Sequence, residues 1–199
     1  MCRLNIKIKN MYLFFDTETT GLPKNWRAPL SNLNNWPRMI QIAWILCDSN
    51  GSRIESNSYI IKPENFIIPL QAYMVHGIST ERALDEGSDL KTVLTEFNEL
   101  IDESDYIVAH NISFDEKIVG AEFLRKKIIS NLNRKRKLCT MQASTNLCRL
   151  PGPYGFKWPK LSELHMKLFG YDFEEAHDAS VDINATEKCF WEMRKTGWI

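Results

Sequence analysis

Residues 11–22 read MYLFFDTETTGL, an apolar run that ends in Asp16 and carries a second acid, Glu18, two positions later. The run over 11–16 predicts a buried β-strand. Side chains two positions apart on a strand point to the same face, so the two carboxylates are expected to converge. Because a buried carboxylate without a partner is costly, the pattern indicates either a bound cation or an ordinary turn with capping acids.

Two other acidic pairs have this spacing, at 103/105 and 172/174, and both fall in polar stretches. Asp16 and Glu18 form the pair that follows directly on an apolar strand. Hard carboxylate oxygens suit Mg²⁺ or Mn²⁺. On this pair alone, a metal site and solvated turn acids are equally good interpretations.

A second segment, VAHNISFDEK at 108–117, contains a strand that ends at His110 and places Asp115 in the first turn of the next helix. The helix dipole tolerates an acid there, so an ordinary N-terminal aspartate is one interpretation. Sites in α/β sheets lie at the C-terminal ends of adjacent parallel strands, however, and we expect strand 106–110 beside strand 11–16. In that arrangement Asp115 reaches the first two acids.

A third segment, HDASVD at 177–182, opens the last predicted helix. Asp178 is expected to cap that helix, and Asp182 lies one turn further along the same face. His177 comes just before the helix start. A lone histidine is more often a packing residue than a catalytic one, but a histidine five positions before an acid favours a place in the same site.

The remaining patterns predict an α/β fold. A β-hairpin meander comes first and strands alternating with helices follow, which indicates a mixed five-stranded sheet with helices on both faces. We expect a single domain over 11–199, and an extension at 1–10 that either frays or precedes the true start codon. The predicted elements are strands 11–16, 38–48, 52–62, 106–110 and 137–140, helices 89–103, 113–128 with Ser113 as its N-cap, 140–149, 161–169 and 178–195, and a loop at 151–159.

The composition bounds the class of protein. The 199 residues suit one α/β domain, and the equal numbers of basic and acidic residues give no global sign of a nucleic-acid binder. Basic residues crowd the segment 125–137, where a solvated helix end is favoured over a strip that attracts phosphates.

Five scattered cysteines, with no C-x-x-C, argue against a disulfide framework or a structural zinc site. The scattered cysteines, together with the lack of a secretory signal and of a long apolar run in the sequence, predict a cytoplasmic protein.

The stretches FDTETTGL (15–22), AHNISFD (109–115) and HDASVD (177–182) resemble, in order and spacing, the three motifs of the DEDDh 3′–5′ exonucleases. These DnaQ-like proteins include ribonuclease T, oligoribonuclease and the proofreading epsilon subunit of DNA polymerase III, whose exonuclease domain this chain resembles. The resemblance covers roughly residues 11–195. The His-x4-Asp spacing fits the histidine subclass, because the tyrosine subclass has a tyrosine where this chain has Asp178.

The resemblance implies a ribonuclease H-like fold and two Mg²⁺ or Mn²⁺ ions held by four acids. One ion would lie among Asp16, Glu18 and Asp182. Asp16 would also hold the other, with Asp115 acting mainly through water. His177 would be the general base. These roles are physically sound, because two such ions can stabilise both the attacking water and the leaving oxygen, and an imidazole can take the proton of that water.

The resemblance also implies a pocket for the terminal nucleotide, built from the turn after the first two acids. Backbone N–H groups and a hydroxyl there can hold the 3′ hydroxyl, and Leu22 can wedge against the terminal base. Phe114 either supports the terminal sugar or packs in the core, and Asn111 either contacts the substrate or closes its turn. The candidate substrate-binding residues are Thr19, Thr20, Gly21, Leu22, Val75, His76, Asn111 and Phe114.

Two segments differ from short members of the family. The loop 23–37 carries Trp26 and Trp36 among cations, and PYGFKWPK at 153–160 carries three aromatics and two lysines. Aromatics interleaved with cations suit the stacking of single-stranded bases. Tryptophans that cover the edge of the sheet are an equally good interpretation of the loop.

The leading prediction is a metal-dependent 3′–5′ exonuclease that hydrolyses phosphodiester bonds in single-stranded DNA and releases nucleoside 5′-monophosphates, in repair or proofreading. An exoribonuclease is the alternative, because the preference for DNA rests on resemblance. A catalytically silent nucleic-acid-binding or polymerase-binding module would lack an acid or the histidine, and all are present. A third hypothesis is a proofreading subunit that works through a DNA polymerase. The short tail after the last helix favours a stand-alone enzyme.

Overall fold

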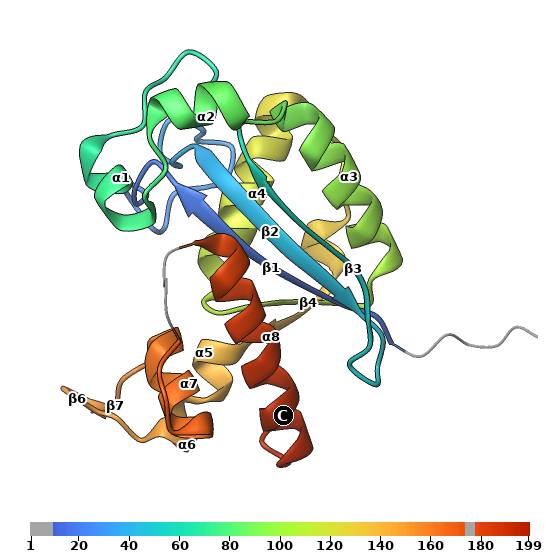
Figure 1. Cartoon of the computed structure of the whole chain (residues 1–199), viewed down its shortest axis with the longest axis vertical. Coiled ribbons are helices and arrows are strands. Elements are labelled where there is room, and N and C mark those ends of the chain that lie inside the picture. Colours follow the sequence, from blue (N-terminus) through green and yellow to red (C-terminus); the bar gives the residue numbers. More distant parts are fainter. Residues whose placement is uncertain (1–9, 174–177) are drawn as a thin grey trace, which may run out of the picture.

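The structure is a computed structural model that describes residues 10–173 and 178–199. Its centre is a five-stranded sheet with the strand order β3-β2-β1-β4-β5 (Figure 1). The strands are β1 (Tyr12–Thr19), β2 (Met39–Cys47), β3 (Arg53–Ile60), β4 (Tyr106–Ala109) and β5 (Arg136–Cys139). Strand β2 pairs antiparallel with both β1 and β3, whereas β4 pairs in parallel with both β1 and β5. The predicted mixed sheet is confirmed.

Both faces of the sheet are apolar. Successive residues of β1 point to opposite faces, and the apolar residues 12–15 are all buried. The helices that cover these faces are α3 (Leu90–Glu103), α4 (Ile112–Lys126) and α8 (Ala179–Lys195). The ring of Phe15 lies 5.4 Å from that of Phe97 in α3, and the ring of Phe14 lies 5.1 Å from that of Phe190 in α8. In Figure 1, α8 crosses the front of the sheet, while α3 and α4 lie behind it. The prediction of helices on both faces is therefore confirmed.

The smaller elements correct the sequence-based boundaries. They are α1 (Leu70–His76), α2 (Thr80–Glu86), a 3₁₀ turn (Leu132–Arg134), α5 (Thr140–Ala143), α6 (Thr145–Cys148), α7 (Leu161–Phe169) and the hairpin strands β6 (Pro151–Gly152) and β7 (Gly155–Phe156). The patterns did not predict α1 and α2, because each helix buries only one or two side chains. The helix predicted over 140–149 is broken where the Ser144 hydroxyl donates to the Thr140 carbonyl. The predicted loop 151–159 contains the small hairpin.

The start of α4 corrects a predicted cap. Ser113 is not the N-cap, since α4 begins at Ile112 and Asn111 holds the cap position with a φ of 74°. Asparagine tolerates this left-handed conformation better than most residues. Ser113 instead donates its hydroxyl to Asn111 Oδ1 at 3.0 Å. This turn places Asp115 in the first turn of α4.

A buried ion-pair network holds the loop 23–37 against the sheet and α4. Glu122 of α4 is fully buried, and its Oε1 lies 2.9 Å from both Arg38 Nε and Arg125 Nη1. The Arg125 guanidinium also donates to three carbonyl oxygens of the loop, at 2.6, 2.7 and 3.4 Å. The long loop is therefore fastened to a helix that carries one of the candidate acids.

His110 connects the end of β4 to the segment before α7. Its Nε2 lies 3.0 Å from the Pro159 carbonyl oxygen, and its Nδ1 lies 3.0 Å from Thr140 Oγ1. A neutral ring satisfies both partners by donating from Nε2 and accepting at Nδ1. Burial lowers the pKa of His110 to about 4, although the bond to Pro159 opposes this shift.

We expect the stability that His110 provides to disappear in acid. Its pKa is 6.5 in the unfolded chain and about 4 in the fold, so the unfolded chain binds the proton more strongly between these values. The free energy of unfolding therefore falls as the pH falls from 6.5 to 4, by at most about 3 kcal/mol. Urea unfolding of the wild type and of His110→Gln across this window measures the effect. A difference between the two proteins that stays constant with pH contradicts it.

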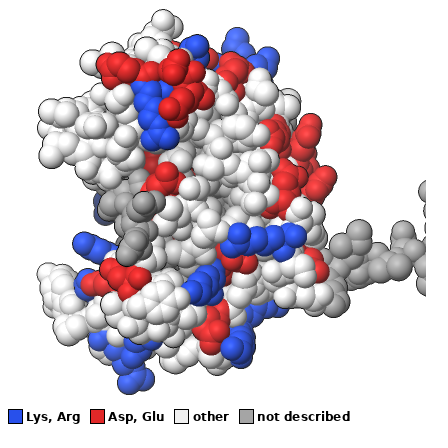
Figure 2. Space-filling view, in the orientation of Figure 1, with Lys and Arg blue, Asp and Glu red and all other residues white. Residues whose placement is uncertain are grey.

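Several global features complete the fold. The cysteines among the described residues, Cys47, Cys139, Cys148 and Cys189, are free thiols. Within residues 10–173 and 178–199, no helix combines the length and the apolar character needed to cross a membrane. Acidic and basic side chains are interspersed over the face shown in Figure 2. Residues 1–9, most of the predicted extension, lie outside the described residues.

Candidate active site

Three acids from two elements meet toward the C-terminal end of β1. Asp16 and Glu18 belong to that strand, and Asp182 comes from the first turn of α8. One carboxylate oxygen of each lies within 4.8 Å of the others. The spacing of two along a strand places the first two acids on one face, and the start of α8 adds the third.

Asp178 and Gln41 fix the start of α8 against the sheet. Asp178 is the N-cap, and its Oδ1 accepts from the Ser180 amide at 2.8 Å, which is the cap that the sequence predicts. Gln41 Oε1 accepts from the Ala179 amide at 3.1 Å. Because Asp182 lies one turn further along the helix, this attachment sets its position relative to β1.

The fourth acid, Asp115, lies next to β1 but is not part of the group of three. It is 3% exposed, and its Oδ1 accepts from the Thr17 hydroxyl at 2.8 Å and from the Thr17 amide at 3.1 Å. Thr17 stands between Asp16 and Glu18 in the strand. The bonds therefore hold the start of α4 beside the other acids.

Negative charge is concentrated in this partly buried region. Burial, followed by the charges of Asp182 and Asp115, raises the pKa of Glu18 to about 8. Burial raises the pKa of Asp115 to about 7, although its bonds from Thr17 oppose the shift. The pKa of Asp16 is also raised, by burial first and then by the neighbouring carboxylates. Burial and mutual repulsion thus both disfavour the charged forms of these acids.

This set of donors fits divalent cations. Among the residues that the structure describes, no Lys or Arg forms an ion pair with Asp16, Glu18 or Asp115. Carboxylate oxygens that converge in this way are typical ligands of Mg²⁺ and Mn²⁺. Asp16, Glu18 and Asp182 are the residues that could share one ion.

The turn that follows the acids is fixed internally and open at its tip. Gly21 has a φ of 140°, a conformation that favours glycine. The Thr19 hydroxyl donates to the Gly21 carbonyl at 2.7 Å, and Thr20 Oγ1 accepts from the Arg38 amide at 2.9 Å. The side chain of Leu22 is 74% exposed. Leu22 is thus available to a ligand, while the hydroxyls of Thr19 and Thr20 hold the turn in shape.

The other candidate substrate residues have different surroundings. Val75 is exposed on α1, whereas His76 is buried and its Nδ1 accepts from a backbone amide two residues on, at 3.1 Å. Asn111 forms the left-handed turn before α4, and Phe114 packs partly against the core. The candidate base His177 lies outside the described residues.

The two tryptophans of the loop 23–37 have different environments. Trp36 is 3% exposed, and its Nε1 donates to the Pro29 carbonyl at 3.2 Å. Trp26 remains half-exposed, and its ring lies 5.8 Å from that of Phe114. Trp36 therefore fits the interpretation in which tryptophans cover the sheet, whereas Trp26 lies beside a candidate nucleotide-binding residue.

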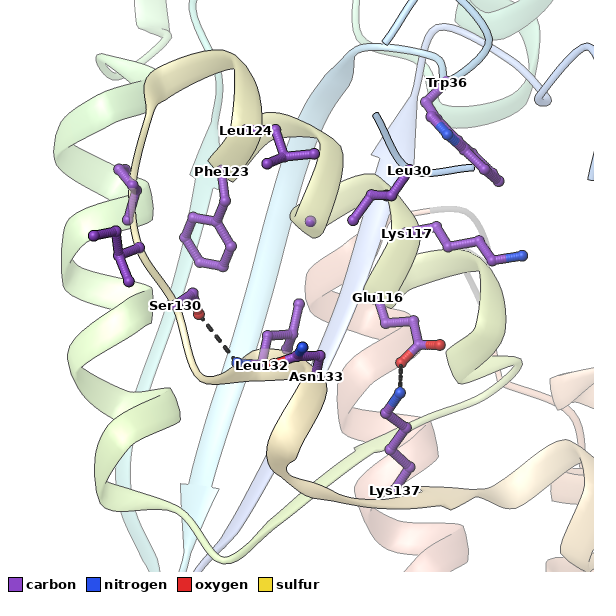
Figure 3. A pocket seen from close by; sticks show the side chains of 13 residues that line it. Leu30, Trp36, Glu116, Lys117, Phe123, Leu124, Ser130, Leu132, Asn133 and Lys137 are labelled. Carbon is purple, nitrogen blue, oxygen red and sulfur yellow. Dashed lines mark hydrogen bonds and ion pairs between the residues drawn. The ribbon is translucent and has the colours of Figure 1, made fainter. Parts of the chain in front are cut away.

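A mainly apolar cavity of about 450 Å³ lies between this loop, α4 and the segment 128–137 (Figure 3). Leu30 of the loop and Phe123 of α4 line it, and an ion pair between Glu116 and Lys137 lies at its side. None of the four candidate acids lines the cavity. We therefore do not assign it to the acid site.

Sequence reasoning missed two residues that position the acids, Thr17 and Gln41. The signal for Gln41 is visible in retrospect, because Gln41 carries the one polar amide side chain in the buried strand MIQIAWILC at 39–47. A lone polar residue in such a strand needs a hydrogen-bond partner. Thr17 gives a weaker signal, since a threonine is ordinary in a strand.

Comparison with known proteins adds a family match. The family model RNase_T, described as exonuclease, matches residues 13–190 of this chain. The match includes all three motifs and the four candidate acids. It covers the central sheet and extends into α8.

The curated relatives are much longer proteins. The PolC-type DNA polymerase III of Staphylococcus epidermidis is 25% identical over 182 residues, which cover 92% of this chain and 11% of that polymerase. The corresponding polymerase of Staphylococcus aureus gives the same identity and coverage. The chain thus spans about a tenth of the length of these relatives.

Solved structures of E. coli exonuclease I are similar in fold. A complex with single-stranded DNA in a zinc-bound form has a TM-score of 0.73 and 22% identity, and covers 94% of this chain and 41% of that one. A complex with a dT13 oligonucleotide has a TM-score of 0.74 with the same identity and coverage. The likeness supports the ribonuclease H-like fold that the sequence predicts.

Proposed function

Because the chain belongs to the DnaQ-like 3′–5′ exonucleases, a family of hydrolases, we propose that it trims single-stranded DNA from the 3′ end and releases nucleoside 5′-monophosphates. The observation that carries this proposal is the convergence of Asp16, Glu18 and Asp182 within 4.8 Å, with Asp115 held nearby through Thr17. These acids lie where β1 ends, and the exposed turn at Leu22 follows at once.

Two divalent ions, Mg²⁺ or Mn²⁺, fit this arrangement. Asp16, Glu18 and Asp182 would hold one, and Asp16 and Asp115 would hold the second, with Asp115 acting mainly through water. When bound, such a pair supplies stabilisation of negative charge on the attacking and leaving oxygens.

The chain's own groups would bind and orient the end of the strand. Backbone amides of the turn after Glu18 donate to the 3′ hydroxyl, and the exposed Leu22 packs on the terminal base. Phe114, together with Trp26 at 5.8 Å, forms an aromatic wall for the terminal sugar. His177 takes the proton of the attacking water on a ring nitrogen. The support for His177 is its spacing from Asp182 in the third motif.

The comparisons support DNA as the substrate and a polymerase as a partner. The exonuclease I structures are complexes with single-stranded DNA or DNA oligonucleotides, and the curated relatives are DNA polymerases. We propose that the chain acts in proofreading or repair, in association with a DNA polymerase. The free thiols favour a reducing compartment, the cytoplasm.

A paired assay tests the choice of substrate. DNA and RNA oligonucleotides of the same sequence, each labelled at the 5′ end, are incubated with the chain in Mg²⁺ or Mn²⁺. We expect the DNA to be shortened faster. Faster shortening of the RNA would assign the chain to the exoribonucleases. If the folded protein binds metal and shortens neither strand, the alternative of a silent binding module takes its place.

Metal binding should stabilise the fold, since the ions relieve repulsion between the acids. At a Mg²⁺ concentration 100-fold above its Kd, the expected gain is about 2.7 kcal/mol. That gain corresponds to a rise in Tm of roughly 5–10 °C. Thermal unfolding in Mg²⁺ and in EDTA measures it, and Asp182→Asn should lose most of the shift. An equal Mg²⁺ shift in the variant contradicts the assignment of Asp182.

A further inference from the structure

The segment 149–160, RLPGPYGFKWPK, is unusual in composition and exposure. It contains Arg149, Lys157 and Lys160 and no acid. Its three aromatic side chains all face solvent: Tyr154 is fully exposed, Phe156 is 50% exposed and Trp158 is 60% exposed. A group of exposed apolar side chains on a protein surface often marks a binding site.

The segment has a defined shape that holds these aromatics outward. Strands β6 and β7 pair through Gly152 and Gly155, and the Lys157 amide donates to the Leu150 carbonyl at 2.9 Å. A side chain at Gly152 would come within 2.9 Å of the Lys157 backbone nitrogen, so the hairpin closes tightly there. Lys157 also forms an ion pair with Glu163 of α7 at 2.6 Å. The hairpin is thus fastened to the first turn of α7.

The base of the hairpin is attached at the acid end of the sheet. Pro159 is buried, and its carbonyl oxygen lies 3.0 Å from His110 Nε2. His110 follows β4, which runs parallel to β1 with Val108 opposite Phe14. His110 therefore lies at the same end of the sheet as Asp16 and Glu18, which follow Phe14 in β1. Figure 1 shows the hairpin projecting from the body of the fold at the lower left.

Resting on the proposed function, we propose that this hairpin is a second nucleic-acid subsite, which binds the single strand upstream of the terminal nucleotide. Bases stack on the exposed rings of Tyr154, Phe156 and Trp158, and Arg149 and Lys160, the cations of the segment other than the paired Lys157, lie near the phosphates. Every base offers a face for stacking, so this mode of binding tolerates any sequence. An enzyme that shortens a strand stepwise needs such tolerance, because each cycle brings a new base to each position.

The lysines of the segment favour a nucleic acid over a protein partner. Aromatic residues are enriched in protein interfaces as well, but lysine is depleted there, whereas exposed aromatics combined with lysines suit a single strand with stacked bases and phosphates. In addition, Trp36 is covered and Trp26 lies against Phe114. Tyr154 and Trp158 of the hairpin are therefore more open to a base than either tryptophan of the loop 23–37.

The test compares a long substrate with one too short to reach the hairpin. The wild type, Trp158→Ala and the double variant Tyr154→Ala/Trp158→Ala are assayed on a single-stranded DNA 20-mer and on the p-nitrophenyl ester of thymidine 5′-monophosphate. We expect KM for the 20-mer to rise between about 5- and 100-fold with kcat unchanged. Activity on the ester should stay at the wild-type value. Trp158→Phe should restore most of the affinity for the 20-mer.

Matched controls separate this proposal from its alternatives. Trp198→Ala removes another half-exposed tryptophan, beyond the end of α8, and should leave both substrates unaffected. Equal losses on the 20-mer and on the ester would overturn the proposal, because they would show that the hairpin only supports the fold. An unchanged KM for the 20-mer would also overturn it, and would point to a protein partner on this surface.

A binding measurement keeps the subsite distinct from the proposed function. Fluorescence anisotropy of labelled dT20 reports affinity whether or not the strand is cut. If the wild type binds dT20 without shortening it and the double variant binds it more weakly, the subsite stands while the exonuclease proposal fails. If both proteins bind dT20 equally, the subsite is wrong whatever the activity.

Discussion

Asp16→Asn is expected to lower the rate of 3′ shortening by at least ~10³-fold, which corresponds to about 4 kcal/mol of transition-state stabilisation. Asp16 is the acid assigned to both metal ions, so its loss disturbs the whole charge arrangement. The amide keeps the shape of the side chain and removes a charge that the fold disfavours, since burial already raises the pKa of Asp16. The variant should therefore fold normally, which circular dichroism and Tm measurements can verify.

The matched control for this variant is Glu103→Gln. Glu103 is an exposed acid at the end of α3 and belongs to another acidic pair with a spacing of two. We expect it to retain the wild-type rate. If Asp16→Asn keeps activity within about tenfold of the wild type, the acid group is not the reaction centre.

Glu122→Gln is expected to destabilise the fold by about 3 kcal/mol or more. Glu122 is fully buried and lies 2.9 Å from both Arg38 and Arg125, whose side chains are 24% and 14% exposed. Removing its charge leaves the partly buried Arg125 guanidinium without an acidic partner among the described residues, and leaves Arg38 with Glu64 at 3.5 Å. Removing one partner of a buried ion pair is strongly destabilising, because the other charge stays buried. Urea unfolding measures the loss of free energy.

The exposed pair Arg82–Glu86 provides the comparison for this stability measurement. Its side chains are 49% and 52% exposed at a separation of 2.8 Å. Because solvent screens such a pair, Glu86→Gln should cost less than about 1 kcal/mol. Similar losses in the two variants would show that the buried network does not hold the loop 23–37 in place.

The parts of the fold that could be predicted are those in which local pattern and packing agree. Strand β2 is a run of nine buried residues, and α3 buries six apolar residues at helical spacing. Asp16 could be located because it follows an apolar run within β1, and Asp178 because it opens a helix. In contrast, α1 and α2 bury too few side chains to leave a periodic signal.

The contacts that shape the acid site could not be predicted in the same way. Thr17 and Asp115 are 98 positions apart in the chain, and Gln41 and Ala179 are 138 apart. No local pattern specifies such pairs, because each depends on which strands and helices become neighbours in the folded sheet. The sequence therefore indicates which acids form the group, but not what holds them.

The loop 23–37 and the segment 153–160 show the same limit. Both carry aromatics among cations, and the sequence does not decide whether these aromatics stack on bases or pack against the fold. Packing separates them, since Trp36 is covered while Trp158 is 60% exposed. Burial against distant elements, rather than composition, decides which aromatic rings are open to a ligand.

The most direct test of the account follows a single-stranded DNA labelled at its 5′ end, incubated with the wild-type chain in Mg²⁺ and, separately, in EDTA. The account predicts a ladder of shortened products that all keep the label, with nucleoside 5′-monophosphates released, and no reaction in EDTA. DNA that stays intact in Mg²⁺, or a label released first as a mononucleotide, would contradict the claim that these acids direct hydrolysis from the 3′ end.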